Sequence, residues 1–368
     1  MIERAAKFAV PLALAGLLAI AAAAPAFAES SSWFTREKET PVPKLAPSPK
    51  KPPQLTAPAT LVPEPGGASD MRNKIPTEVP ATGDDAAYTA FDQGQYLTAL
   101  KLAEEAAARG EPQANTLIAR IYTEGLGVQK DDRKAFEYYK RASDLGDIQG
   151  TFALAISYAQ GRGVKKDRKA AAELFEKAAL TGQPDANYNL GLLFLKGDGK
   201  PENPIRAFQH IRYAAEKGLA QAQYDLAALY QNGTGTDANA LEAARWLSRA
   251  AEQGYPEAQY EYAIRLIQGM GLTKDEPKIP ALMKAAAGKG IAGAQNRLAY
   301  IYFDGIKVKK DPVEAAKWRL IAKKNGYEDE ELDARIAAMP KADRQKAEAA
   351  ASAWSDRIRV DAGLADAP

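Results

Sequence analysis

The sequence predicts an all-α protein, specifically a right-handed α-solenoid of stacked helix hairpins. Two observations indicate this fold class. Residues 111–326 divide without insertion into six units of 36 residues, and each unit ends in glycine. Within each unit, apolar side chains recur at i, i+4 and i+8, a spacing that places them on one face of a helix. Repeats of this length are typical of helix pairs that bury their apolar faces by stacking on their neighbours.

The first helix of each unit is predicted from three recurring positions. A small residue is followed after four residues by a large apolar one and after four more by another large side chain, as in Ala222, Leu226 and Tyr230. A G-x-G turn comes next, at residues 233–235 in this unit, and the last unit has Lys307 at the second glycine position. Glycine adopts positive φ without strain, so the turn is expected to reverse the chain.

The second helix of each unit is predicted to start after an Asp or Asn residue, whose side chain can accept hydrogen bonds from the free amides of the first turn. This residue lies four positions after the end of the turn: Asp131, Asp167, Asn203, Asn239, Asp275 and Asp311. Alanines recur along one side of the following helix, for example at Ala135 and Ala142. Such small side chains allow neighbouring helices to pack closely.

Two segments are expected to close the ends of the repeat array at residues 111–326. Residues 81–110 are predicted to form a degenerate amino-terminal repeat or cap, and residues 327–368 are predicted to form capping helices and a tail. In the latter segment, Trp354 and Ile358 are expected to pack on the last repeat.

The first 80 residues are predicted to lie outside the folded array. Residues 1–28 have the features of a cleaved secretory signal peptide, with Arg4 and Lys7 before an apolar run and a small-x-small motif at its end. A retained membrane anchor is the alternative. Residues 29–80 hold 11 of the 23 prolines and are expected to be a disordered linker. Pro49 and Pro52 fit PxxP, so a ligand for a proline-binding module is the alternative there.

The composition excludes several classes of function. The chain has no cysteine and one histidine, which removes disulfides, thiol nucleophiles and multi-histidine metal sites. A net charge of +2 argues against nucleic-acid binding. His210 occupies a repeat position held elsewhere by large apolar residues such as Leu174 and Trp246, which favours helix packing over catalysis. We therefore predict no catalytic residue, no metal site and no cofactor.

The repeat pattern resembles that of a known family. The segments QANTLIARIYTEGLGV from Gln113 and QAQYDLAALYQNGTGT from Gln221 are similar to the Sel1-like repeat (SLR), a branch of the tetratricopeptide superfamily. The resemblance covers 216 of the 368 residues. It implies a stack of helix hairpins with a concave binding surface. Exported bacterial members of this family commonly act in envelope regulation, exopolysaccharide control, cell-wall assembly or host interaction, so the resemblance implies a role of this kind.

A column of mostly aromatic residues is the candidate binding site. It runs two positions after the first alanine of four successive units, at Phe152, Tyr188, Tyr224 and Tyr260. Comparison with tetratricopeptide proteins implies that this side of the first helix borders the concave groove, together with Arg120, Tyr300 and Phe303. Aromatic rings in a groove could bind an apolar peptide or stack on sugars. The alternative, which we favour, is that these rings fill space between successive repeats.

The function expected from this resemblance is that of a non-enzymatic periplasmic or secreted scaffold or regulator. Its groove would bind a segment of another envelope protein, with polar groups such as Gln231 and Asn232 at the rim. Recognition of peptidoglycan or exopolysaccharide by the aromatic column is the alternative. We predict no nucleic-acid partner, and membrane contact only if the signal peptide is retained.

Overall fold

The computed structural model describes residues 83–268 and 276–361. The predicted signal peptide and linker, the G-x-G turn at residues 269–271 and the helix cap Asp275 lie outside these ranges. Among the helices of the described ranges, none is both long enough and apolar enough to span a membrane.

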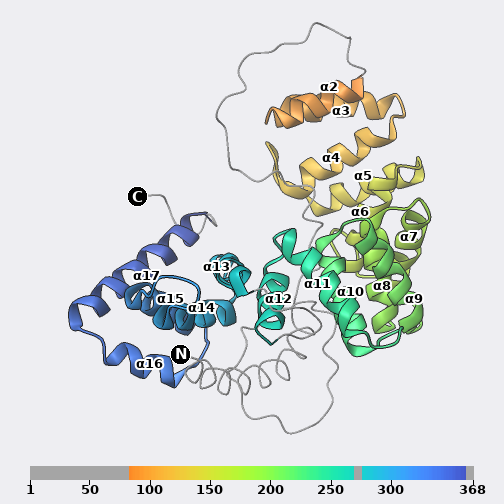
Figure 1. Cartoon of the computed structure of the whole chain (residues 1–368). Coiled ribbons are helices and arrows are strands. Elements are labelled where there is room, and N and C mark those ends of the chain that lie inside the picture. Colours follow the sequence, from red (N-terminus) through yellow and green to blue (C-terminus); the bar gives the residue numbers. More distant parts are fainter. Residues whose placement is uncertain (1–82, 269–275, 362–368) are drawn as a thin grey trace, which may run out of the picture. The chain divides into compact units, whose positions relative to one another are not determined.

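The described residues form sixteen α-helices and one short 3-10 turn, which confirms the predicted all-α class (Figure 1). They divide into two compact units at residues 83–219 and 220–361. The first unit contains α2 (Gly83–Asp92), α3 (Tyr96–Ala108), α4 (Pro112–Glu124), α5 (Asp132–Asp144), α6 (Ile148–Gln160), α7 (Arg168–Leu180), α8 (Pro184–Lys196) and α9 (Pro204–Glu216). The second contains α10 (Ala220–Asn232), α11 (Ala240–Glu252), α12 (Pro256–Gln268), α13 (Ile279–Gly288), α14 (Ala292–Asp304), α15 (Pro312–Lys324), α16 (Glu330–Ala337) and α17 (Lys341–Asp361).

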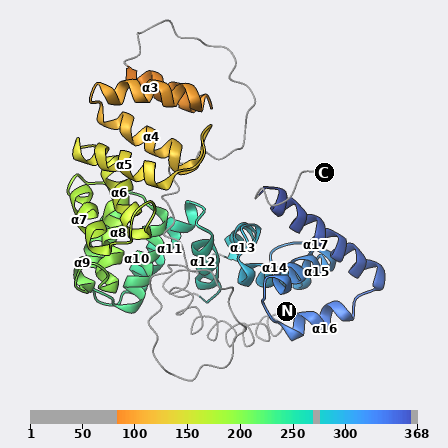
Figure 2. The same ribbon diagram turned by 180° about the vertical axis from the view of Figure 1, so that it is seen from behind.

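Within each unit, consecutive helices pack as adjacent pairs that stack on one another, as predicted for a solenoid (Figures 1 and 2). The core consists of successive apolar clusters, one of which joins α2, α3 and α4 and another α6, α7, α8 and α9. Each cluster combines residues of neighbouring hairpins, because a single hairpin leaves one apolar face uncovered.

The two turn glycines have different physical roles. The first ends the helix in the left-handed conformation, as at Gly125 with φ 70°, where its N–H donates to Ile121 O. The second also makes a close approach: a Cβ at Gly163 would overlap the carbonyl oxygen of Asp132, at the start of the preceding second helix. In the last unit Lys307 adopts φ 57° at this position.

The predicted amino-terminal caps are present on five of the six second helices, within the described residues. The Asp131 side chain accepts from Arg133 N at 3.1 Å and from Lys134 N at 3.0 Å, and Asp167, Asn203, Asn239 and Asp311 cap their helices in the same way. The fifth unit differs. A 3-10 turn at Glu276–Lys278 precedes α13, which has 10 residues instead of 13. Prolines at positions 277 and 280 account for this tighter start, because proline supplies no N–H for the helix ladder.

A column of polar residues on the first helices, which the sequence analysis did not identify, ties each hairpin to the one before it. The amides of Asn187, Gln259 and Gln295 each donate to a carbonyl oxygen eight residues earlier, at the end of the preceding second helix. Each of these carbonyls also accepts from the N–H of the glycine three residues later, so the amide adds a second hydrogen bond and links the two hairpins. Gln295 is fully buried.

The carboxyl-terminal helices α16 and α17 pack on the last hairpin. Arg319 of α15 is fully buried and donates to both carboxylate oxygens of Asp333 in α16, at 2.8 and 3.1 Å, and to Tyr327 O. Trp354 of α17 contacts Trp318 edge-on at 5.6 Å between ring centroids. The side chain of Ile358 lies outside the described residues.

Candidate functional site

The seven candidate binding residues all lie on first helices of the hairpins. In residues 83–219 these are Arg120 on α4, Phe152 on α6 and Tyr188 on α8. In residues 220–361 they are Tyr224 on α10, Tyr260 on α12, and Tyr300 and Phe303 on α14. Phe152, Tyr188, Tyr224 and Tyr260 occupy one repeat position, Arg120 and Tyr300 share a second, and Phe303 lies at a third.

Four of the seven side chains are buried. Phe152, Tyr188, Tyr224 and Phe303 are 2–8% exposed. Phe152 packs against Phe175 at 5.7 Å between ring centroids, and Tyr224 packs against Tyr255 at 5.1 Å. This burial favours the packing interpretation for these four residues, since little of their rings is accessible to a sugar or peptide.

Side chains at the repeat position of the aromatic column also contact the next hairpin. Thr116 and Asn296 flank the column at the same repeat position in the first and last units, and three side chains at this position donate hydrogen bonds to an acidic residue about one repeat further along: Thr116 to Asp147 at 2.6 Å, Tyr224 to Glu261 at 2.7 Å, and Asn296 to Asp329 at 2.7 Å. The column therefore joins successive hairpins to one another.

The contact between Tyr224 and Glu261 involves a carboxyl group with a raised pKa. Burial raises the pKa of the Glu261 carboxyl to about 8, while the Tyr224 hydrogen bond and the Arg265 charge act in the opposite direction. Arg265 is also buried, and its Nη2 donates to Gln231 Oε1 at 2.9 Å. Gln231, expected at the groove rim, is thus bound to the next first helix, whereas the other rim residue, Asn232, is exposed.

The other three candidates are only partly buried. The guanidinium of Arg120 lies 4.6 Å from the Phe91 ring centroid, and its Nε bonds Glu124 at 2.8 Å. The Tyr300 hydroxyl donates to Asp329 at 3.2 Å, and burial together with the Asp329 charge raises its pKa. Burial raises the pKa of Tyr260 to about 12. Partner binding by these three residues stays a prediction.

His210 takes part in packing between helices. Its Nδ1 lies 2.9 Å from Asn187 Oδ1, and its ring stacks on Phe194. The Asn187 amide nitrogen already donates to the carbonyl oxygens of residues 179 and 183, so its oxygen faces the imidazole and Nδ1 carries a proton. Burial and the nearby Arg206 charge lower the pKa of His210. In the described ranges, no group of three or more His, Asp or Glu side chains could hold a metal ion.

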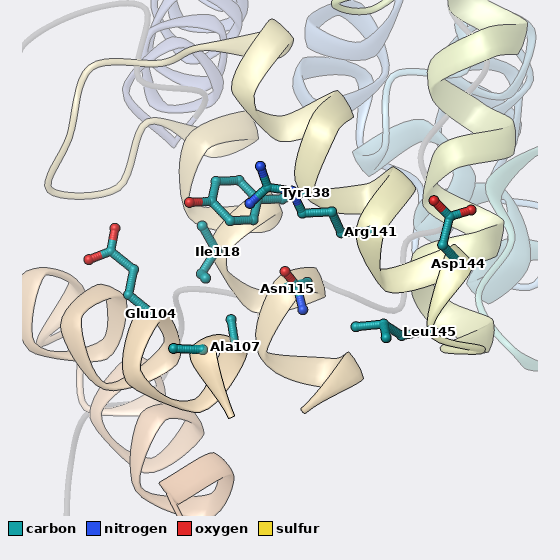
Figure 3. Close-up of a pocket in the computed structure, with 9 residues that line it drawn as sticks. Glu104, Ala107, Asn115, Ile118, Tyr138, Arg141, Asp144 and Leu145 are labelled. Atoms are coloured by element: carbon teal, nitrogen blue, oxygen red, sulfur yellow. The ribbon is translucent and has the colours of Figure 1, made fainter. Parts of the chain in front are cut away.

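A pocket of about 480 Å³ opens between α3, α4 and α5, and the sequence analysis missed it (Figure 3). It is lined by Glu104, Ala107, Ala108, Asn115, Ile118, Tyr138, Arg141, Asp144 and Leu145. One signal in the sequence could have identified it. Leu145 is 50% exposed, and the equivalent residues of the other units are polar: Arg109, Thr181, Lys217, Gln253, Lys289 and Asn325.

These features define a scaffold of stacked helix hairpins, and the comparison with known proteins assigns its family. The chain belongs to the Sel1 repeat family, whose profile matches residues 112–147, 148–182, 184–219, 220–255, 256–282 and 292–327. The earlier resemblance is thereby confirmed. No protein of curated function matches the chain.

Two solved structures illustrate the similarity. A Sel1 repeat protein from Oxalobacter formigenes is 31% identical, with a TM-score of 0.60 over 65% of this chain and 98% of its own. A protective antigen of uropathogenic Escherichia coli with the SLR fold is 24% identical, with a TM-score of 0.49 over 78% of this chain and 72% of its own. Sel1 repeat proteins usually act as non-catalytic binding scaffolds, and their fold is suited to binding other proteins.

Proposed function

We propose that this protein is a non-enzymatic scaffold of the bacterial envelope that binds a segment of another envelope protein. One observation carries the proposal. Among the described residues, conspicuous polar and aromatic side chains of the repeats are engaged in packing, within a hairpin for His210 and between hairpins for the Tyr224–Glu261 pair. Side chains used in this way fix the shape of a surface and leave no assembled set of reacting groups.

In each unit separately, the exposed edges of the first helices are the proposed binding surface. Arg120, Tyr260 and Tyr300 keep part of their side chains accessible. Partly buried tyrosine and arginine side chains are effective anchors, because their conformations are fixed before the partner arrives. An amphipathic helix or an extended segment of the partner could bind to such anchors.

Export is part of the proposal. The signal features of residues 1–28 support removal of this segment and a periplasmic or secreted location. Fractionation of cells and amino-terminal sequencing of the mature chain test this directly. Recovery of the intact chain from the cytoplasm would contradict it.

Site-specific photocrosslinking in intact cells tests the binding surface. A benzophenone amino acid is placed at Tyr300 or Arg120 and, as a matched control, at Glu137, which is exposed on the second helix α5. We expect one discrete protein adduct from the first two positions and none from the control, with the partner identified by mass spectrometry. Equal labelling from all three positions, or no protein adduct from any, would overturn the proposed surface.

A further inference from the structure

The pocket between α3, α4 and α5 has the chemistry of a site for a proline-rich strand. Figure 3 shows Glu104 of α3 and Asp144 of α5 on opposite sides, with Ile118 and Tyr138 between them. Ile118 is buried and Tyr138 is partly exposed, so the floor is apolar. An apolar floor with an aromatic ring and an acidic edge suits a ligand that combines prolines with basic residues.

The pocket also offers hydrogen-bond donors to the backbone of a bound strand. Arg141 is exposed, and its guanidinium lies 5.1 Å from the centroid of the Tyr138 ring. A polyproline II strand has no internal hydrogen bonds, so each of its carbonyl oxygens is free to accept one. Arginine offers five N–H donors, which makes Arg141 suited to bind such carbonyls.

The chain itself carries a segment of the matching kind. Residues 41–53, PVPKLAPSPKKPP, contain six prolines and three lysines and no acidic residue. They lie outside the described residues and precede α2, the first helix of the unit that holds the pocket. The 29 residues between Pro53 and Gly83 could extend about 90 Å at roughly 3.1 Å per residue, enough to reach a pocket near the start of the described chain.

We propose that this pocket binds residues 41–53 of its own chain. The lysines of the segment are placed to pair with Glu104 and Asp144, and its prolines cover Tyr138 and the exposed side chain of Leu145. Because the segment is tethered, its effective concentration at the pocket is on the order of millimolar, so an intrinsic Kd of about 0.1 mM gives high occupancy. The segment then docks on the repeats instead of acting only as a spacer.

The test measures the distance between the segment and the pocket in the proposed mature chain, which begins at residue 29. The native sequence has no cysteine, so Gln54→Cys and Lys140→Cys provide two unique sites for spin labels. Lys140 is exposed on α5 and does not line the pocket. Pulsed electron–electron double resonance measures the distance between the two labels. A docked segment is expected to give a narrow distribution of this distance.

Two matched charge reversals make the result specific. The pocket variant is Glu104→Lys with Asp144→Lys, and the control is Glu105→Lys with Glu137→Lys, in which both residues are exposed and neither lines the pocket. We expect the ratio of docked to free segment to fall on the order of tenfold in the pocket variant only, since two exposed attractions become repulsions. The four reversed positions are exposed, so folding is expected to be retained, and circular dichroism checks this.

Three results would overturn the inference. The first is a broad distribution of label-to-label distances in the protein whose pocket is unaltered. The second is a narrow distribution that the pocket variant leaves unchanged, because the segment would then dock elsewhere. The third is a narrow distance that also arises between singly labelled chains mixed in solution, because a second copy would then supply the segment.

Discussion

Replacing Glu261 by glutamine is expected to change how stability depends on pH. Burial raises the pKa of the Glu261 carboxyl to about 8, whereas in the unfolded chain a Glu titrates near its model value of 4.5. The folded protein therefore holds this proton more strongly than the unfolded chain. Stability contributed by this group is full below pH 4.5 and is lost as the pH rises through 8.

The magnitude follows from these two pKa values. Each unit of difference corresponds to about 1.4 kcal/mol, so the stability that Glu261 contributes at low pH falls by about 3 kcal/mol at pH 7 and by about 5 kcal/mol at pH 9. Glu261→Gln keeps an oxygen that can accept from Tyr224, which bonds the native carboxylate at 2.7 Å, and removes the charge. The variant is thus expected to be more stable than the native protein above pH 6, with a smaller difference at pH 5.

Urea unfolding at pH 5, 7 and 9, followed by tryptophan fluorescence, measures the effect. Trp246 and Trp318 lie in the same unit as Glu261, and a Trp33→Phe background removes the signal of the amino-terminal tryptophan. Glu252→Gln, at an exposed position on α11, is the control and should keep the native pH dependence. If the free energies of unfolding of the native and Glu261→Gln proteins change equally with pH over this range, the reasoning is refuted.

Three further substitutions test the packing. Gly163→Ala should destabilise the protein by at least about 2 kcal/mol more than Gly146→Ala in thermal unfolding, because both positions have positive φ but only the first meets a backbone carbonyl. Equal losses would contradict that explanation. Arg319→Met should cost about 3–5 kcal/mol in urea unfolding, whereas Lys323→Met, which removes a half-exposed partner of the same Asp333, should cost under about 1 kcal/mol. Gln295→Leu should cost about 1–3 kcal/mol, because it removes the hydrogen bonds that the buried Gln295 amide makes with the Ala287 carbonyl and with the Asn325 side chain; an unchanged urea midpoint would refute this role.

The sequence was sufficient to predict the hairpins because their signals are local and recur in every unit. Caps such as Asp131 and turn glycines such as Gly125 act within a few residues, so their chemistry can be recognised without a structure. The departure at α13 was harder to foresee. Pro277 and Pro280 replace the regular cap and first turn there, and their effect depends on which turn the chain adopts.

The accessibility of the aromatic column could not be predicted from the sequence. Whether Tyr224 faces a groove or a neighbour depends on residues far along the chain, since its ring packs against Tyr255 and its hydroxyl donates to Glu261, 37 residues away. The polar column at Asn187, Gln259 and Gln295 was visible as a repeat position, but its role depends on carbonyls at the ends of other helices.

The short range of these contacts has a consequence for how the chain acquires its fold. The main helix contacts join first or second neighbours along the chain, and the hydrogen bonds between hairpins span intervals such as 29 residues from Tyr300 to Asp329. Low contact order favours fast folding, since little loop entropy is lost before each contact forms. A hairpin can therefore dock as soon as the next 40 or so residues emerge from the ribosome or from a translocation channel, without waiting for the rest of the polypeptide.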